Sequence, residues 1–348
     1  MRNVSKFVLF FILFFQVYSI DRVCKNPKNS PVDWYVIFFF PKSISSDNQI
    51  HYAYIDNTMS SLQYYKYEES SFPPTIITKY VTSNPQSTEI NYFFWNDDLT
   101  TKGGDSKSAP STRAHAKGTL VYDKNKGTFL LHSLPRFPTR TSSNEVLTEL
   151  PSNAGSYGQH FLCISVSKAT SEKIAELLNY INISNNNSVK KDNVNSSPNK
   201  WISALIANKF DKSYPSELTT HIKSLGGVDF TFISKNYMKV IIPYDTTVRS
   251  MYKDDFYVRT WAKPALAPAI CQEYSLFNVE SVVYGQYKYG IQKEHSKWAI
   301  SVNKAINCFG DLNHCKSQDD RGGNIVCFQN ENLHNIMKNA VNGIDSCP

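Results

Sequence analysis

Residues 115–138 read HAKGTLVYDKNKGTFLLHSLPRFP, and the rest of the chain is organised around this stretch. His115 and Lys117 stand two positions apart at its start, followed by an apolar, strand-like run. Because side chains of a strand alternate between its two faces, a strand that reads His-x-Lys points both groups to the same side. The pattern therefore predicts an imidazole and an ammonium group facing one small volume.

A second copy of the pattern, His295-Ser296-Lys297, lies far downstream. Two such strands, if they met, would place two imidazoles and two ammonium groups around one anion. This arrangement suits attack on a phosphodiester: one His attacks phosphorus, the other protonates the leaving oxygen, and the lysines stabilise the non-bridging oxygens. A single His-x-Lys is a weak signal, because most histidines are ordinary surface or core residues.

Both motifs are followed by the same kind of sequence. Residues 118–123 and 127–133 read as two strands joined by a turn, and His132 ends the second strand, seventeen residues after the first motif's His. In the second copy the chain continues as WAISVNKAINCFGDLN, and Asn313 lies eighteen residues after that motif's His. We interpret this as an internal pseudo-repeat.

Several segments together resemble the deoxyribonuclease II family. They are DWYVIFFFPK (33–42), FFWND (93–97), RAHAKGTLVYDKNKGTFLLHSLPRFP (113–138), SYGQHFLCISVS (156–167), EHSKWAISV (294–302), and NCFGDLN followed by RGGNIVC (307–327). The family is similar to the phospholipase D superfamily, whose active site combines two His-x-Lys motifs from two related halves. Strict phospholipase D motifs carry an Asp five residues after the Lys, where this chain has Tyr122 and Val302.

The resemblance implies an α/β fold made of two related phospholipase D-like halves. Each half is expected to be a mixed β-sheet flanked by helices, and the two form a pseudo-dimer within one chain, so that no further oligomer is required. The expected divisions are a signal peptide (1–19), an N-terminal half (20–181), an exposed glycosylatable linker (182–199) and a C-terminal half (200–348).

The resemblance also implies six catalytic residues, which are His115, Lys117, His132, His295, Lys297 and Asn313. The two motif histidines are the nucleophile and the acid/base, in an order that the sequence leaves open. The two lysines bind the phosphate, and His132 and Asn313 orient these groups. The competing interpretations are that His132 is an ordinary core histidine and that Asn313 only forms a turn.

Gln159 and Trp298 are the candidates for substrate binding. Gln159 stands in a segment that matches the family, and Trp298 directly follows the second motif, where its ring could stack on a base. A structural role for Gln159 and simple packing of Trp298 are the competing interpretations.

The resemblance implies an acid, metal-independent endodeoxyribonuclease that leaves 3′-phosphate ends and needs no cofactor, because lysines and an imidazolium replace Mg²⁺. One neutral and one protonated His give an optimum near or below the imidazole pKa of ~6.5. Two alternatives stay open. One is a secreted, catalytically weak pseudonuclease that binds DNA or another polyanion, favoured by Ala299 where vertebrate members usually carry Cys. The other is a phosphodiesterase acting on a lipid.

The first nineteen residues read as a secretory signal peptide. Arg2 and Lys6 form a basic start, and Phe7–Phe15 is continuously apolar. An uncleaved membrane anchor is the alternative, but this run is shorter than the ~20 apolar residues that a spanning helix needs. We therefore expect a secreted or lysosomal protein that is not bound to a membrane once the signal is removed.

The chain is basic, with a formal net charge of +7. Removal of Arg2 and Lys6 with the signal leaves 7 − 2 = +5, and all eight histidines lie downstream, where an acidic compartment would charge them. A protein that becomes more basic in acid suits a polyanion such as DNA. A purely solubilising surface charge is the competing interpretation.

Seven cysteines in a secreted chain predict disulfides and one cysteine left over. Six cysteines allow fifteen pairings, among which the sequence cannot choose. The resemblance implies the pairs Cys24–Cys163, Cys271–Cys347 and Cys308–Cys327, with Cys315 free or paired between chains. Cys308, His314 and Cys315 lack a convincing fourth ligand for a zinc site.

Residues 182–199, NISNNNSVKKDNVNSSPN, are nearly free of large apolar groups and predict an exposed linker. They carry glycosylation sequons at Asn182, Asn186 and Asn195. Outside this linker, periodicity and turn signals predict further elements. The predicted strands include 33–40, 50–56, 61–67, 161–166, 239–243 and 279–287, and the predicted helices are 171–180, capped by Ser171 or Thr170, 200–209, 215–225 and 331–342.

Overall fold

The computed structural model describes residues 22–83, 90–100, 106–108, 110, 112–140, 146–147, 149–183, 189–191, 200–207 and 209–347. The predicted signal peptide, Asn186 and Asn195 lie outside these residues. None of the helices in the described part of the chain is both long and apolar enough to cross a membrane.

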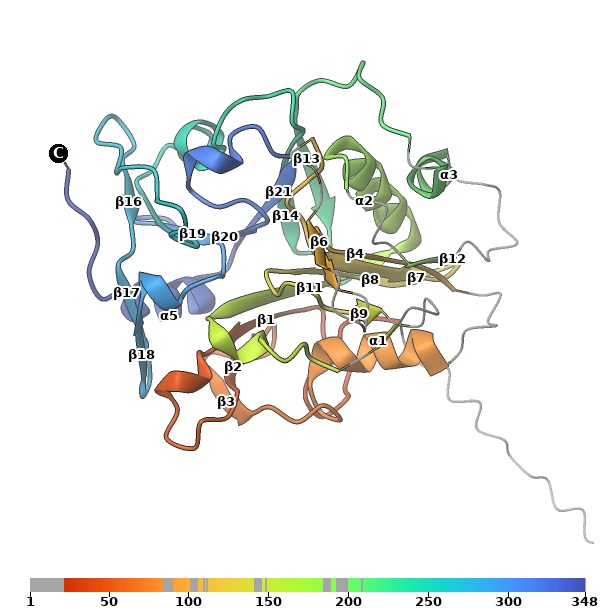
Figure 1. Ribbon diagram of the computed structural model, residues 1–348, viewed down its shortest axis with the longest axis horizontal. Coiled ribbons are helices and arrows are strands. Elements are labelled where there is room, and N and C mark those ends of the chain that lie inside the picture. Colours follow the sequence, from red (N-terminus) through yellow and green to blue (C-terminus); the bar gives the residue numbers. More distant parts are fainter. Residues whose placement is uncertain are drawn as a thin grey trace, which may run out of the picture.

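Two large β-sheets dominate the fold, which is of the α/β class (Figure 1). The first sheet has the strand order β12 (Val189–Lys191), β4 (Asn91–Trp95), β7 (Gly118–Tyr122), β8 (Lys126–His132), β11 (Gln159–Ser167), β1 (Trp34–Phe39), β2 (His51–Asp56) and β3 (Gln63–Lys66). Every described strand pair in it is antiparallel, so the expectation of a mixed sheet is wrong for this half.

The second sheet is drawn from residues 217–329. Its strand order is β13 (Glu217–Lys223), β14 (Asp229–Lys235), β21 (Gly323–Gln329), β20 (Ile306–Gly310), β19 (Trp298–Ser301), β15 (Phe256–Arg259) and β16 (Leu276–Asn278). Only the β15–β16 pair is parallel among its described pairs, which makes this sheet mixed.

The same arrangement of five antiparallel strands stands at the centre of both sheets. In the first sheet the neighbours are β4, β7, β8, β11 and β1, and in the second they are β15, β19, β20, β21 and β14. The chain visits them in matching order, as β1, β4, β7, β8, β11 and then β14, β15, β19, β20, β21. Each His-x-Lys motif directly precedes the strand that comes third in chain order within its set, β7 or β19.

Few helices accompany the sheets. They are α1 (Pro73–Ser83), α2 (Lys168–Tyr180), α3 (Lys200–Ala207), α4 (Arg249–Tyr252) and α5 (Glu331–Ala340). Short strand pairs are β5 (Asp98–Thr100) with β6 (Ser106–Ser108), β9 (Thr139–Arg140) with β10 (Val146–Leu147), and β17 (Ser281–Tyr284) with β18 (Tyr287–Gly290).

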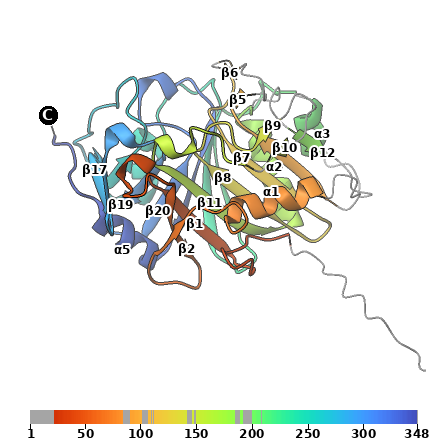
Figure 2. The ribbon, with the colours of Figure 1, turned by 60° about the horizontal axis from the view of Figure 1, so that its bottom comes forward.

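Strand β1 is apolar throughout because both of its faces are buried. Its alternate residues belong to two different hydrophobic clusters: Val36 and Phe38 face a layer shared with the second sheet, and Tyr35 and Ile37 face the opposite side. Helix α1 covers that opposite side, as its contact through Ile77 indicates (Figure 2).

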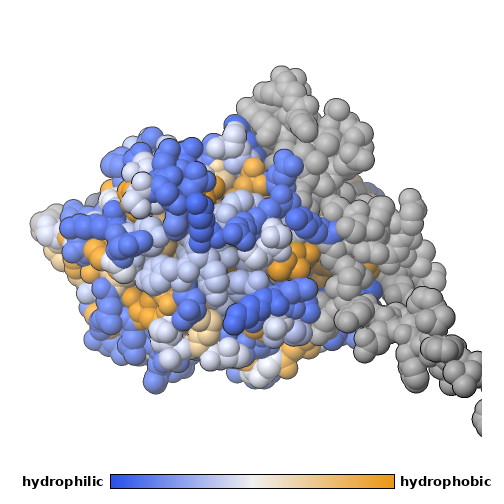
Figure 3. Space-filling view, turned by 90° about the horizontal axis from the view of Figure 1, so that it is seen from below, coloured by the Kyte–Doolittle hydropathy of each residue, from blue (hydrophilic) through white to orange (hydrophobic). Residues whose placement is uncertain are grey.

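The shared layer holds the two sheets together. Aromatic pairs cross it, with ring centroids 5.1 Å apart for Trp34 and Phe328 and 5.5 Å apart for Phe129 and Phe232. Helices α2 and α5 contribute their apolar faces to the same layer. The outer face of the second sheet buries its own cluster, which includes Tyr244. On the face seen in Figure 3, hydrophilic side chains predominate and hydrophobic ones form separate patches.

The three predicted disulfides are confirmed. Cys24 pairs with Cys163, Cys271 with Cys347, and Cys308 with Cys327. Cys315 is a free, buried thiol. The disulfides tie the chain's beginning to β11, the C-terminal segment to residue 271, and β20 to its neighbour β21.

Several local predictions for the second half were wrong. Residues 215–225 form strand β13 rather than a helix, because β-branched residues along it pair with β14. Residues 239–243 form no strand, and the predicted strand 279–287 falls in the hairpin of β17 and β18, which ends at Gly290. In the first half, helix α2 begins earlier than expected, with Ser167 as the residue whose side chain caps it.

Asn182, the first predicted glycosylation position, is buried. Its Nδ2 donates to Thr112 O at 2.8 Å, and its Oδ1 accepts from Arg113 at 2.6 Å. A glycan on Nδ2 would displace the first bond and require exposure of this side chain. The prediction of a glycan here, and of an exposed linker beginning at this residue, is therefore corrected.

Candidate active site

The first motif lies directly before β7 rather than within it. His115 and Lys117 nevertheless point to the same side, because both reach the carboxylate of Asp97. Asp97 stands two residues past the end of β4. The Nε2 atom of His115 lies 3.4 Å from Asp97 Oδ2, and the Lys117 ammonium forms an ion pair with Oδ1.

The second motif takes the same position before β19. The Lys297 ammonium lies 3.4 Å from His295 Nδ1 and donates to the His295 carbonyl at 2.7 Å. The ring of Trp261 lies 4.9 Å from the His295 ring, centroid to centroid. His295 therefore has an indole as its neighbour, where the first motif has a carboxylate.

Each motif histidine is oriented by the opposite sheet. His115 Nδ1 lies 2.8 Å from Asp311 O, just after β20, and His295 Nδ1 lies 3.0 Å from Ser133 O, just after β8. Since a carbonyl oxygen only accepts hydrogen bonds, Nδ1 carries the proton in both rings. The Nε2 atom of each neutral imidazole is then the nitrogen with the free lone pair.

Backbone hydrogen bonds also connect each motif histidine to the other half of the chain. His115 N donates to Gly322 O at 2.8 Å, and His295 N donates to Gly158 O at 2.9 Å. Gly322 directly precedes β21, whereas Gly158 directly precedes β11. Each motif is thus hydrogen-bonded to the residue directly before β21 or β11, and these two strands hold corresponding positions in the two sheets.

The structure brings the two motifs close enough to affect each other's ionisation. Burial lowers the pKa of His115 well below its usual value, against the opposing effect of Asp97. Burial, then Lys297 and Lys117, lower the pKa of His295 well below its usual value. Burial and the nearby Lys117 lower the pKa of Lys297 to about 7.

Burial raises the pKa of Asp97, but His115, Lys117 and Arg321 outweigh this effect and hold that pKa below its usual range. The carboxylate therefore remains ionised. It is the negative counterpart of the cationic groups around it.

A family model described as deoxyribonuclease II matches residues 23–347. The chain belongs to the deoxyribonuclease II family. Its relatives include cell-death-related nuclease 7 of Caenorhabditis elegans, which is 27% identical over 98% of this chain and 92% of that protein. Deoxyribonuclease-2-beta of Mus musculus is 26% identical over 94% of this chain and 93% of that protein. Plancitoxin-1 of Acanthaster planci is 26% identical over 93% and 92%. Family membership makes the protein a hydrolase of the nuclease class.

Within this deoxyribonuclease II fold, His132 ends β8 and is buried against Phe161, with ring centroids 5.4 Å apart. Burial, then Lys117, lower the pKa of His132 to about 3, so the ring is neutral. Asn313 is also buried, and its Oδ1 has no hydrogen-bond partner among the described residues. Asn313 lies two residues beyond the carbonyl that binds His115.

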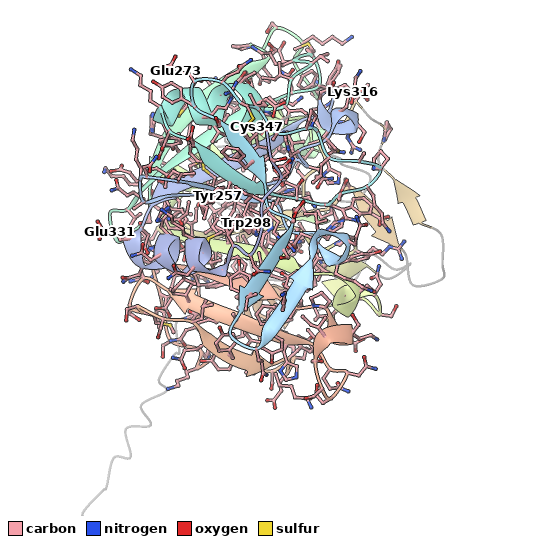
Figure 4. The ribbon with its side chains drawn as sticks, turned by 90° about the vertical axis from the view of Figure 1, so that its left-hand side faces the viewer. Tyr257, Glu273, Trp298, Lys316, Glu331 and Cys347 are labelled. Carbon is pink, nitrogen blue, oxygen red and sulfur yellow. A yellow bond between two sulfur atoms is a disulfide. The ribbon has the colours of Figure 1, made fainter. Side chains whose placement is uncertain are left out.

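The two candidates for substrate binding have other contacts. Gln159 Oε1 accepts from Ser133 Oγ at 2.6 Å and lies 3.2 Å from His295 Nδ1, so this side chain touches the histidine. Trp298 is 1% exposed and belongs to the hydrophobic layer between the sheets (Figure 4). The prediction that Trp298 stacks on a base is wrong, because neither face of its ring is open.

Sequence reasoning missed several residues that surround the motifs. Asp97 lies in the family-like segment FFWND (93–97), but the sequence indicated no role for it, and nothing in the sequence pointed to Trp261. Asp311 accepts from the backbone of Lys117 at 3.4 Å and of Asn324 at 2.9 Å, and burial raises its pKa to about 7.

Two arginines hold the backbone beside the motifs. Arg321 donates to Arg113 O at 3.0 Å and to Ala114 O at 3.3 Å, directly before the first motif. Arg259 forms a fully buried ion pair with Glu294, directly before the second. Among the described residues, no three His, Cys, Asp or Glu side chains are grouped as metal ligands.

Proposed function

We propose that this protein is an acid, metal-independent endodeoxyribonuclease that leaves 3′-phosphate ends. The observation that carries the proposal is the reciprocal orientation of His115 and His295 by carbonyls of the opposite sheet. These contacts leave Nε2 as the reactive nitrogen of each neutral ring, and we propose that both Nε2 atoms act on one phosphodiester. DNA as the substrate is inferred from the family and from the names of its relatives.

We assign the nucleophile to His295 and the general acid to His115. Burial lowers the pKa of His115, and Asp97, which lies beside its Nε2, opposes that effect and favours the protonated form. His295 instead has the Lys297 ammonium and the Trp261 ring as neighbours, which favour a neutral ring. A neutral imidazole is the form that attacks phosphorus.

The reaction then follows in two balanced steps. His295 Nε2 forms a bond to phosphorus as the bond from phosphorus to O5′ breaks, and the His115 imidazolium gives its proton to O5′. Neutral His115 next takes a proton from water, whose oxygen attacks phosphorus. The bond from phosphorus to His295 breaks, and the product keeps its phosphate on O3′.

The two lysines are proposed to stabilise the charge of the phosphoryl oxygens. Lys117 and Lys297 lie beside the two histidines, and both are buried, where an ammonium acts strongly on a nearby anion. Because the pKa of Lys297 is lowered to about 7, this ammonium is fully charged only below that pH. Its titration supports an acid optimum. His132 and Asn313 are proposed to hold these groups in position.

We also propose that the chain is a pseudo-dimer of two phospholipase D-like halves, divided at residues 182–199. The matching order of five central strands supports this relation, as does the exchange of hydrogen bonds between the motifs. One chain carries both motifs, which supports activity as a monomer. The proposed signal peptide and the sequons at Asn186 and Asn195 favour a secreted or lysosomal glycoprotein.

The secreted pseudonuclease remains the second candidate function. The burial of the site favours it, because His115 is 8% exposed and His295 is 6% exposed, which leaves little of either ring open to a substrate. The two carbonyls that fix the proton on Nδ1 of both histidines favour the enzyme, because DNA binding alone does not need a defined tautomer.

Asp97→Asn tests the assignment of the general acid through the pH profile. Asp97 raises the pKa of His115 against the effect of burial. Removal of this negative charge lowers that pKa, so less of the acid is protonated at any given pH. We expect the basic limb of log(kcat/KM) against pH to move to lower pH.

The control for this experiment is Asp98→Asn, which changes the neighbouring carboxylate. Asp98 pairs with Arg136 at 3.3 Å rather than with a residue of either motif. We expect its basic limb to coincide with that of the wild type. A basic limb that stays in place or moves to higher pH in Asp97→Asn would contradict the role given to His115.

A further inference from the structure

Two partly exposed aromatic rings flank His295. Trp261 follows β15, and its ring centroid lies 4.9 Å from that of His295. Tyr157 precedes β11, and its ring centroid lies 6.2 Å from that of His295. Both rings differ from Trp298, which is 1% exposed. An aromatic ring that is partly open beside a reacting group can stack on a flat ligand.

A cation and an unused donor accompany these rings. Lys263 is exposed, and its ammonium lies 5.8 Å from the centroid of the Tyr157 ring. The indole Nε1 of Trp261 is buried and has no hydrogen-bond partner among the described residues. Buried donors usually find a partner, so this N–H is available to an acceptor on a bound ligand.

The two halves differ at the position that holds Trp261. In the sheet register, Trp95 pairs with Gly118 and Arg259 pairs with Trp298, each partner standing three residues after its motif's His. The position two residues beyond Trp95 is Asp97, and the position two beyond Arg259 is Trp261. Equivalent positions thus carry a carboxylate against one histidine and an indole against the other.

We propose that Trp261, Tyr157 and Lys263 form a nucleotide subsite. The base of the nucleotide on the 5′ side of the scissile phosphate stacks on the rings, and Lys263 contacts the next phosphate of the strand. This inference rests on the proposed function, because it takes His295 as the nucleophile that holds the retained phosphoryl group. Stacking on a ring tolerates every base, so the subsite recognises nucleic acid rather than a particular sequence.

Two esters with the same leaving group test the subsite. Thymidine 3′-(p-nitrophenyl phosphate) carries a base on the retained side, and methyl p-nitrophenyl phosphate carries none. We compare kcat/KM for the two esters in wild type, Trp261→Ala and Trp261→Phe. In Trp261→Ala the ratio of the nucleoside ester to the methyl ester should fall by roughly tenfold, and Trp261→Phe should retain most of the preference.

The outcomes separate the subsite from the proposed function. An equal loss on both esters in Trp261→Ala would mean that the indole acts through His295 alone, and would overturn the subsite. Full activity of Trp261→Ala on both esters would overturn it as well. Failure of the wild type to hydrolyse either ester at acid pH would overturn the proposed function itself, and the subsite with it.

Discussion

Replacing His295 with alanine is expected to reduce DNA cleavage by at least ~10³-fold. The substitution removes the nitrogen that attacks phosphorus and leaves no other nucleophile in the same position. The Nδ1 bond to Ser133 O and the 3.2 Å contact with Gln159 show that the ring is held by its surroundings. The loss should therefore appear in kcat, measured by nicking of supercoiled plasmid near pH 5.

His221→Ala is the matched control for this variant. His221 lies exposed on β13, where its ring contacts Thr231. We expect this protein to nick plasmid at the wild-type rate. If His295→Ala kept more than about a tenth of the wild-type rate while folded, His295 would not be the nucleophile.

Breaking the Arg259–Glu294 pair is expected to have the largest effect on stability. Both side chains are 0% exposed, and Nε lies 2.5 Å from Oε2. The other carboxylate oxygen accepts from the backbone of His295 at 3.1 Å and of Ser296 at 2.9 Å. Arg259→Met leaves this carboxylate buried without its counter-ion, so the free energy of unfolding should fall by ~3–5 kcal/mol. Urea unfolding with the disulfides intact measures the change.

Two further variants make this result specific. In Arg259→Met/Glu294→Met neither of these two buried positions carries a charge, so much of the lost stability should return. Lys223→Met breaks an ion pair with Asp229 whose side chains are 66% and 68% exposed, and it should change stability little. If Arg259→Met were as stable as the wild type, the pair would not hold the second motif in place.

The sequence identified the parts of the site that lie within one continuous segment. Both His-x-Lys motifs were found from their spacing, and β1 from its run of apolar residues with burial on both faces. The disulfides followed from the family resemblance, since seven cysteines alone leave the pairing open. The His-x-Lys segments were expected to be strands, and they lie just before β7 and β19 instead.

The parts that sequence reasoning missed depend on contacts between distant segments. Asp97 meets Lys117 because β4 and β7 are neighbours in register, and the sequence does not reveal that register. Trp261 reaches His295 through the β15–β19 pair in the same way. The aromatic side chain beside the substrate was expected to be Trp298, next to the motif. Trp298 is the first residue of β19, and its side chain packs in the layer between the sheets instead.

The prediction of a helix at 215–225 failed for a related reason. Leu218, Ile222 and Leu225 are spaced like one face of a helix, which made that assignment attractive. The segment instead pairs along β14 from Glu217 to Lys223, and tertiary pairing outweighs a short helical pattern.

The most direct test of the central claim is plasmid cleavage by the mature protein near pH 5 in excess EDTA, beside His115→Ala. We predict that the wild type cuts and that its ends carry 3′-phosphates, which block polymerase extension until a phosphatase removes them. His115→Ala should not cut. Cleavage that EDTA abolishes, or equal cleavage by both proteins, would contradict the metal-independent histidine mechanism. If neither folded protein cut, the account would give way to a DNA-binding pseudonuclease.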